Sequence, residues 1–366
     1  MDETDPNIVF DKNGICNHCL NYYSNIFPYW KNNGEKESKL FELAEKIKKE
    51  NRDKEFDCIL GISGGVDSSY LAYYTKEKLE LNPLIFHVDA GWNSELAVSN
   101  IDKIITGLNL ELFTEVVNWK EMQDLQLSYF KSGVPCLDTP QDHIFFAAMY
   151  NFAKKNNIKY IFNGGNYSTE CIREPLEWHY HASDLRQLKD IHKKFGKVEI
   201  KTLPLSDIFK YKIYYRYFKN MQVVQPLNFI KYEKKKAIET LKKKFNWSEY
   251  KYKHYESRFT RFYEGYWLLE KFGYDKRKAH LSSLILTKQL SRVDAINELK
   301  NKPYSNEEKL DDFNYISKKL GISEQVLVDL FNSKNKSFKD YKSNYFLIQF
   351  FVKVARFLKL ERRLIH

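Results

Sequence analysis

The residues best suited to chemistry in this chain form one short run, from Ser63 to Ser69. It combines two adjacent glycines, three hydroxyl side chains and one carboxylate, directly after an apolar stretch. Adjacent glycines can adopt positive φ and leave backbone N–H groups open to a ligand. Such a run could bind pyrophosphate, with a cation such as Mg²⁺ between the carboxylate and the phosphates. The candidate residues are Ser63, Gly64, Gly65, Asp67, Ser68 and Ser69.

The same run could also be an ordinary strand-to-helix turn with Asp67 or Ser68 as its N-cap. The complete string Ser-Gly-Gly-Val-Asp-Ser-Ser after a buried strand favours nucleotide binding instead. The string is not a Walker motif, because no Gly-Lys-Ser/Thr follows the glycines. Nor is it the dinucleotide motif, which needs a third glycine. We expect Asp67, Ser63 and Ser69 to be the catalytic residues of the run.

The elements that must position this run alternate between strand and helix. This alternation predicts an α/β fold, with a parallel, five-stranded-type sheet covered by helices on both faces. The expected strands are 57–62, 84–89, 111–117 and 160–162, and the expected helices are 33–51, 70–78, 94–108, 120–131 and 141–156.

Further candidates follow the ends of other expected strands, where parallel sheets bind their ligands. Asp89 ends the second strand, and Trp92 behind it could stack on a flat ring or be a buried core residue. A second glycine turn, 163–166, follows the fourth strand, although Asn-Gly also marks simple turns. Besides the first run, we therefore expect Asp89, Gly164, Gly165 and Asn166 to bind a nucleotide.

The cysteines suggest a metal. Cys16 and Cys19 have the spacing of half a zinc site, and Cys136 and Cys171 could complete it. A structural zinc would then tie the N-terminal arm to two loops of the site. His18, His179 and His181 are further possible ligands. The alternatives are that these cysteines are free thiols, or that Cys136 or Cys171 is a nucleophile or persulfide carrier.

Composition limits the classes of protein that the chain can belong to. The chain has 366 residues and a formal net charge of +11, which fits an acidic ligand such as a nucleic acid, an anionic membrane or a phosphorylated small molecule. Scattered lysines on solvated helix faces would give the same charge. Five unevenly spaced cysteines, a polar N-terminus and the lack of an apolar run of about 20 residues predict a cytoplasmic protein without a transmembrane segment.

Three parts are expected: an N-terminal arm with the zinc site (1–50), the sheet domain (51–230) and a helical C-terminal domain (231–366). The last should contain helices at 232–245, 260–272, 283–301, 306–320 and 323–331. The apolar and basic tail 345–365 reads as a packed or partner-docking helix, or as a membrane-surface segment. Cations that could neutralise phosphates are Lys231, Arg258, Arg261, Lys276, Arg277 and Lys278.

The run 63–69 resembles the PP-loop of the ATP pyrophosphatase superfamily, which includes GMP synthetase, asparagine synthetase, NAD synthetase and the tRNA-thiolating enzymes. The resemblance implies that ATP is cleaved between its α and β phosphates, with Mg²⁺, and that an acceptor oxygen becomes adenylated. It also implies that the loop at Asp89 meets adenosine and that the turn 163–166 closes over the nucleotide.

Other segments are similar to the N-acetyl sugar amidotransferases of surface-polysaccharide biosynthesis, over about residues 2–300. The segments that carry this similarity are 5–19, 135–143, 163–166, 254–257 and 274–277. The family implies that ATP activates an acetamido group on a nucleotide-activated sugar of a lipopolysaccharide or other surface glycan. Ammonia then displaces AMP and leaves an acetamidino group.

The same resemblance implies that ammonia comes from a separate glutaminase of the histidine-pathway type, with a cyclase-like subunit as a possible further partner. No nucleic acid is expected. A PP-loop tRNA-thiolating enzyme is the alternative, because it would explain the basic charge and the pair Cys136 and Cys171. A non-enzymatic ATP-binding regulator is a third interpretation.

Overall fold

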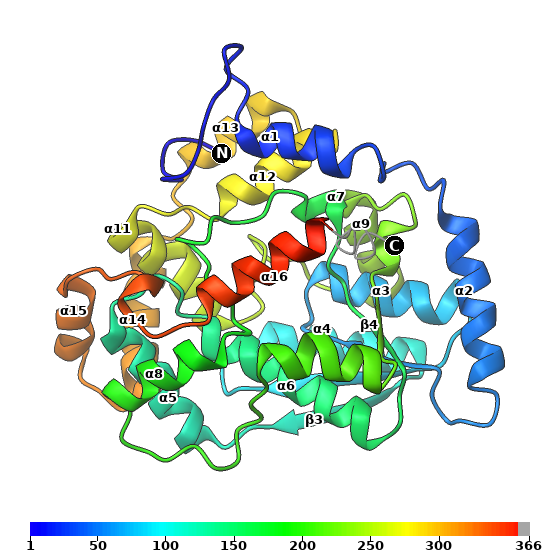
Figure 1. Ribbon diagram of the computed structural model, residues 1–366, viewed down its shortest axis with the longest axis horizontal. Coiled ribbons are helices and arrows are strands. Elements are labelled where there is room, and N and C mark those ends of the chain that lie inside the picture. Colours follow the sequence, from blue (N-terminus) through cyan, green and yellow to red (C-terminus); the bar gives the residue numbers. More distant parts are fainter. Residues whose placement is uncertain (358–366) are drawn as a thin grey trace.

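The computed structural model describes residues 1–357, and its centre is a five-stranded parallel sheet (Figure 1). The strand order is β3-β2-β1-β4-β5. The direction of winding therefore reverses between β1 and β4, which are hydrogen-bonded neighbours, and ligands bind at such a switch point. The strands are β1 (Cys58–Gly61), β2 (Pro83–Asp89), β3 (Glu111–Val116), β4 (Tyr160–Phe162) and β5 (Gln222–Val224).

Helices pack on both faces of the sheet, as the alternating pattern predicted. Successive residues of β1 point to opposite faces, so Ile59 joins one hydrophobic core and Leu60 the other. One core receives side chains from α5 (Trp119–Ser132), α6 (Thr139–Lys155) and α8 (Leu185–Phe195). The other receives them from α2 (Glu37–Glu50), α3 (Val66–Glu77), α4 (Glu95–Leu108) and α9 (Lys234–Phe245). The expected fold class is confirmed.

The N-terminal arm runs along the top of the molecule in Figure 1 and contains α1 (Asn17–Asn21) and the π-helical segment η1 (Tyr22–Ile26). Tyr22, Ile26 and Trp30 pack against Cys171 and Ala279. The arm is thereby anchored to α12 (Arg277–Leu286) and to the segment that follows α7 (Tyr167–Glu170).

Most of the remaining chain is helical. The larger core runs from sheet residues such as Ile161 to Leu327 near the C-terminus, so it crosses the expected boundary at residue 230. The three-domain division stays a prediction. The elements are α7 (Tyr167–Glu170), η2 (Lys210–Phe218), η3 (Pro226–Asn228), α10 (Arg258–Phe262), η4 (Tyr263–Trp267), α11 (Leu268–Phe272), α12 (Arg277–Leu286), α13 (Arg292–Lys300), α14 (Asn306–Leu320), α15 (Glu324–Asn332), η5 (Phe338–Asp340) and α16 (Tyr345–Phe357).

Two expectations about elements need correction. The single helix expected at 283–301 is two helices, because Lys288 adopts a left-handed φ of 60° and Ser291 caps α13 by accepting from the N–H of Asp294. Strand β5 (Gln222–Val224) was not located from the sequence. The tail beyond residue 357 lies outside the described residues. Within residues 1–357, no helix has the length and apolar character needed to cross a bilayer.

Candidate functional site

The turn between β1 and α3 is built so that glycine is required. Gly64 has a φ of 84°, and a Cβ atom there would lie 2.8 Å from the carbonyl oxygen of Ala97. A Cβ atom on Gly65 would lie 2.6 Å from Oε1 of Glu256. Gly65 is the N-cap of α3, and no side chain caps this helix. The N–H groups of the first helical turn are therefore available to an anion.

Two serines and one glutamate complete the mouth of the turn. The Ser63 hydroxyl donates to Oε1 of Glu256 at 3.0 Å and lies 3.3 Å from the hydroxyl of Ser68. A carboxylate thus occupies the position that an incoming phosphate would need. Burial raises the pKa of Glu256, which favours loss of that competing charge. Ser69, by contrast, is fully buried within α3, and its hydroxyl has no partner among the described residues.

Asp67 projects from the first turn of α3 between two donors. Its carboxylate accepts from the Tyr232 hydroxyl at 2.5 Å and from Lys253 Nζ at 3.1 Å. Lys253 also reaches Glu170 at 2.5 Å. Burial alone would lower the pKa of Lys253, but the two carboxylates outweigh it and raise the pKa. Lys253 is therefore a charged ammonium held directly beside the turn.

The second glycine turn meets the first one. A Cβ atom on Gly164 would lie 3.1 Å from the backbone nitrogen of Ser68, so glycine allows this close approach. Asn166 is buried and caps α7 by accepting from the N–H of Thr169 at 2.9 Å. The structure thus brings Gly164 to the mouth of the first turn, while Asn166 shapes the segment behind it.

The loop after β2 is a supporting element. Asp89 accepts from the N–H of Gly91 at 2.7 Å and stabilises the local turn. Trp92 is 1% exposed and packs against the rings of Trp119 and Phe259, so it is a core residue, the second of the two readings that its sequence position allowed. The backbone of this loop is tied to the C-terminal region, because Arg258 N–H donates to the Trp92 carbonyl at 3.0 Å.

Two cavities meet at the site. The smaller one, about 210 Å³, lies over the turn and is lined by Ser63, Gly65, Asp67, Ser68 and Gly164 among others. The larger one, about 1200 Å³, includes Asn166 in its wall. Both cavities are lined by Glu170, Tyr252, Lys253 and His254. Gly64, Ser69, Asp89 and Gly165 line neither of them. The two spaces therefore adjoin at a shared, charged wall.

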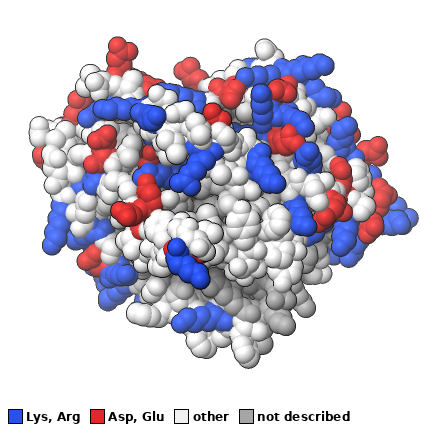
Figure 2. All heavy atoms as spheres, turned by 90° about the horizontal axis from the view of Figure 1, so that it is seen from above, with Lys and Arg blue, Asp and Glu red and all other residues white. Residues whose placement is uncertain are grey.

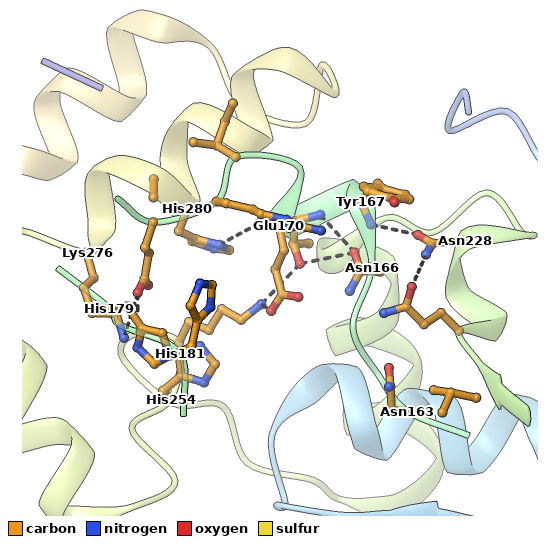
Figure 3. Close-up of a pocket in the computed structure, with 18 of the residues that line it drawn as sticks. Asn163, Asn166, Tyr167, Glu170, His179, His181, Asn228, His254, Lys276 and His280 are labelled. Atoms are coloured by element: carbon orange, nitrogen blue, oxygen red, sulfur yellow. Dashed lines mark hydrogen bonds and ion pairs between the residues drawn. The ribbon is translucent and has the colours of Figure 1, made fainter. Parts of the chain in front are cut away.

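The larger cavity is rich in nitrogen donors (Figure 3). Lys276 at its wall is buried between Glu264 at 2.6 Å and Glu174 at 3.2 Å. Burial raises the pKa of Glu264 to about 7 although Lys276 opposes this. The other basic and amide side chains of the lining are Asn163, Asn166, Arg173, His179, His181, Arg216, Asn220, Gln222, Gln225, Asn228, Lys253, His254, Arg277, His280 and Gln349.

Cys136 is buried behind this wall and interacts with His179, which lines the cavity. Burial would raise the pKa of Cys136, but His179, Thr139 and Lys276 together lower it. The pKa of His179 is raised to about 10, chiefly by Cys136. These directions favour a thiolate beside a protonated imidazole. Thr139 donates to the sulfur at 3.2 Å.

The four-cysteine zinc site is not assembled. Cys16 and Cys19 have their sulfur atoms 3.5 Å apart, and Cys171 packs under the arm, but Cys136 is engaged by Thr139 and His179 instead. His18 is held by Asp5 at 2.6 Å. Within residues 1–357, no group of three or more His, Cys, Asp or Glu side chains could hold a metal ion. The donor set expected from the cysteine spacing therefore does not fit zinc.

Most cations expected to neutralise phosphate are engaged elsewhere. Arg258 and Arg261 both bind the buried Asp312, because α14 packs on α10. Arg277 is paired with Asp275. Lys253 was not identified as a site residue from the sequence, because nothing in a lysine-rich sequence distinguishes it from the other lysines. The only available signal was that it directly precedes the dense polar run 254–257.

Comparison with known proteins gives one family match. Residues 256–355 match the family model of the C-terminal domain of WbpG-like LPS biosynthesis proteins. This match confirms the resemblance to proteins of surface-polysaccharide biosynthesis. It begins at Glu256, the residue that contacts Ser63 in the turn.

A curated relative is similar over a shorter stretch. The chain is 31% identical over 120 residues to the tRNA-specific 2-thiouridylase MnmA 2 of Fusobacterium nucleatum, which covers 31% of this chain. The chain spans 34% of the length of that relative, about one third.

Among solved structures, similarities are distant. The U34-tRNA thiolase NcsA of Methanococcus maripaludis, with its [4Fe-4S] cluster, is 15% identical at a TM-score of 0.33, over 73% of this chain and 81% of that chain. The NH3-dependent NAD synthetase of Campylobacter jejuni is 17% identical at a TM-score of 0.29, over 75% of this chain and 95% of that chain. Similarity at this level carries no argument about the activity of this chain.

Proposed function

We propose that this chain is an ATP-dependent amidotransferase of surface-glycan biosynthesis. Two observations support the proposal: residues 256–355 match the WbpG-like family model, and Glu256 at the start of this region contacts Ser63 in the glycine turn. In the proposed reaction, ATP adenylates the acetamido oxygen of a nucleotide-activated sugar and releases pyrophosphate. Ammonia then displaces AMP and leaves an acetamidino group. The proposed location is the cytoplasm, where both nucleotide substrates are made.

The observation that carries the proposal is the pair of adjoining cavities. The smaller cavity offers the bare helix N-terminus, serine hydroxyls and Lys253 to the outer phosphates of ATP. The larger cavity, at about 1200 Å³, has room for a nucleotide sugar and supplies arginines for its phosphates. An adenylation reaction needs one site for ATP and one for the acceptor, and the two sites must meet where the adenylyl group is transferred.

The chemistry assigns a task to each group. An amide oxygen is a poor leaving group, and adenylation turns it into a good one. As pyrophosphate departs, negative charge grows on its oxygens, where Ser63, Ser68, the α3 N–H groups and Lys253 can stabilise it. Asp67 fits Mg²⁺ as a single carboxylate ligand, the substrate phosphates supplying the others. When bound, the ion would neutralise the same developing charge.

The ammonia is proposed to come from a separate glutaminase of the histidine-pathway type, with a cyclase-like subunit as a possible third component. This part of the proposal is supported by the family resemblance alone. It is testable by co-purification and by comparing glutamine with ammonium as nitrogen source.

The experiment is AMP formation from ATP with ammonium and candidate UDP- and CMP-linked acetamido sugars. Asp67→Asn should abolish sugar-dependent AMP formation, because the phosphates lose their cation anchor. Asp102→Asn, an exposed carboxylate on α4, is the matched control and should behave as wild type. Equal AMP formation by Asp67→Asn and wild type would refute the proposal.

A second candidate is tRNA thiolation, favoured by the 31% identity to the thiouridylase over 120 residues. The buried Cys136, whose pKa is lowered by His179, Thr139 and Lys276, would then carry sulfur. On the face shown in Figure 2, however, basic side chains are interspersed with acidic ones and form no continuous basic patch for a nucleic acid. Sulfur transfer to tRNA that is lost in Cys136→Ser would establish this candidate in place of the first.

A further inference from the structure

His254 occupies the wall that the two cavities share, between two residues that touch the phosphate turn. Lys253 on one side binds Asp67 at 3.1 Å, and Glu256 two residues further accepts from Ser63 at 3.0 Å. The imidazole is exposed to the cavities. It is therefore held next to the place where phosphate and acceptor would meet.

The backbone at His254 is unusual. Its φ is 65°, a left-handed conformation that is uncommon for residues other than glycine, although histidine, asparagine and aspartate adopt it more often than most. Left-handed non-glycine residues cluster at functional sites, where the surrounding structure holds them in place. The strained residue here carries a titratable side chain into a cavity, which is a reason to ask what that side chain does.

Neighbouring histidines are engaged, whereas His254 is not. His280 is bonded through Nδ1 to the carbonyl of Thr169 at 3.1 Å, and His179 lies 3.7 Å from both Asp142 and Glu174. Among residues 1–357, His254 has no hydrogen-bond or ion-pair partner, and Figure 3 shows its ring facing the cavity beside His179 and His181. Both of its ring nitrogens are available to a ligand.

The charges around His254 favour its neutral form. Although the ring is exposed to the cavities, desolvation by the surrounding protein lowers the pKa of His254 well below the usual value, and Lys253, Lys276, His280 and Lys234 all act in the same direction. A neutral imidazole has a free lone pair that can accept a proton from a reacting nitrogen, and the same lowered pKa reduces its strength as a base. The cations that keep it neutral come from several elements, so this property depends on the assembled site.

We propose that His254 accepts the proton released by the nitrogen nucleophile when it attacks the adenylated acetamido carbon. This inference rests on the proposed function. The ammonia lone pair forms the new C–N bond, and the adduct then carries a positively charged nitrogen. One N–H proton passes to a ring nitrogen of His254. The C–O bond to AMP breaks with its electron pair leaving on the phosphate, and the amidinium product remains.

The test separates the two half-reactions in His254→Asn, chosen because asparagine tolerates a left-handed backbone. Sugar-dependent exchange between ATP and pyrophosphate reports adenylation, which should stay close to wild type. Formation of the amidino product with ammonium should fall about 10²-fold, the usual contribution of a general base. Thermal unfolding checks that the variant is folded.

Comparing ammonia with hydroxylamine as the nucleophile distinguishes a proton acceptor from a residue with a purely structural role. Its adduct is more acidic and can lose its proton to water, so the defect of His254→Asn should shrink with this nucleophile. His280→Gln is the matched control. Any loss of product formation in this variant should be equally large with ammonia and with hydroxylamine. A His254→Asn defect that is equal for both nucleophiles, or that affects exchange equally, would overturn the inference. Absence of sugar-dependent exchange in wild type would instead refute the proposed function and, with it, this inference.

Discussion

At the scale of single residues, the mouth of the turn holds opposing charges a few ångströms apart. Asp67 binds Lys253 directly, whereas Glu256 accepts from the Ser63 hydroxyl and lies within the fields of both Lys253 and Asp67. A triphosphate entering this space would gain from the ammonium and be repelled by the Glu256 carboxylate. Glu256 therefore sets the electrostatic cost of nucleotide entry in the structure as it stands.

Replacing Glu256 by Gln should strengthen ATP binding. The substitution removes the negative charge that Glu256 carries when it is ionised, and it keeps an acceptor for Ser63. Because burial raises the pKa of Glu256, the gain in ATP binding should increase as the pH rises. Repulsion between two like charges about 4 Å apart near a protein surface costs roughly 4 kcal/mol. Because about 1.4 kcal/mol corresponds to a tenfold change in affinity, the Kd for ATP should fall about tenfold or more. Isothermal titration calorimetry measures the change.

The matched control is Glu249→Gln. Glu249 lines the same cavity but is paired with Lys242 at 2.6 Å. Its replacement should change the Kd for ATP less than that of Glu256. Weaker ATP binding by Glu256→Gln would show that the carboxylate assists the nucleotide instead of excluding it.

At the scale of elements, the turn depends on how closely β1 and α3 approach α4. Gly64 lies against the Ala97 carbonyl, and its own carbonyl accepts from Trp247 Nε1 at 3.0 Å. The turn is thus fixed by α4 on one side and by the segment after α9 on the other. It is pre-shaped before any ligand arrives.

Gly64→Ala should destabilise the protein by about 2–4 kcal/mol, since it combines a left-handed φ with a backbone clash. Gly273→Ala provides the comparison, because Gly273 has a similar φ of 75° but open space around its Cβ position. That variant should lose only about 1 kcal/mol. Urea unfolding of the two variants gives the difference, and equal losses would show that the contact with Ala97 is not close.

A second element-scale feature is the junction between α10 and α14. Asp312 is fully buried and binds Arg258 and Arg261, with the Tyr304 hydroxyl as a further partner. Arg258 also pairs with Asp311, which is 73% exposed. The ion pairs of the family-matched region are therefore structural and hold its first helix in place behind Glu256.

Asp312→Asn should cost about 3–5 kcal/mol, because it leaves two arginines without their buried counter-charge. Asp311→Asn removes a neighbouring carboxylate that is solvated, and should cost less than about 1 kcal/mol. Chemical denaturation of both variants checks the contrast. Similar small losses would mean that water reaches Asp312.

At the scale of the whole molecule, the site is assembled from residues far apart in the chain. Ser63 follows β1, Gly164 follows β4, and Tyr232, Lys253 and Glu256 come from the part of the chain after β5. The N-terminal arm packs against α12 beside the same region. Any variant that loosens the packing of the C-terminal helices should therefore also disturb the turn.

This arrangement explains what sequence alone could predict. Four strands and both glycine turns follow from local patterns: apolar runs, glycine pairs and the rule that parallel strands end at one edge. The close contact between Gly164 and the first turn of α3 follows from the same topology. These features need only short-range information.

The rest depends on long-range packing. Lys253 is one of many lysines until the fold brings it to Asp67, and Ser69 looks like its neighbours until helix geometry turns it into the core. The zinc expectation is not supported within residues 1–357, where no group of three or more possible ligands is assembled and Thr139 donates to the Cys136 sulfur. Cys136 is instead packed beside His179.

The most direct test of the central claim is the mass of the sugar nucleotide after incubation with the protein, ATP, Mg²⁺ and ammonium. The account predicts that the mass of one acetamido sugar nucleotide changes by the replacement of one oxygen atom by an NH group, with AMP and pyrophosphate formed in equal amounts. It also predicts that Asp67→Asn forms none of these products. An unchanged sugar nucleotide across the UDP- and CMP-linked acetamido sugars, together with sulfur appearing in tRNA, would contradict it.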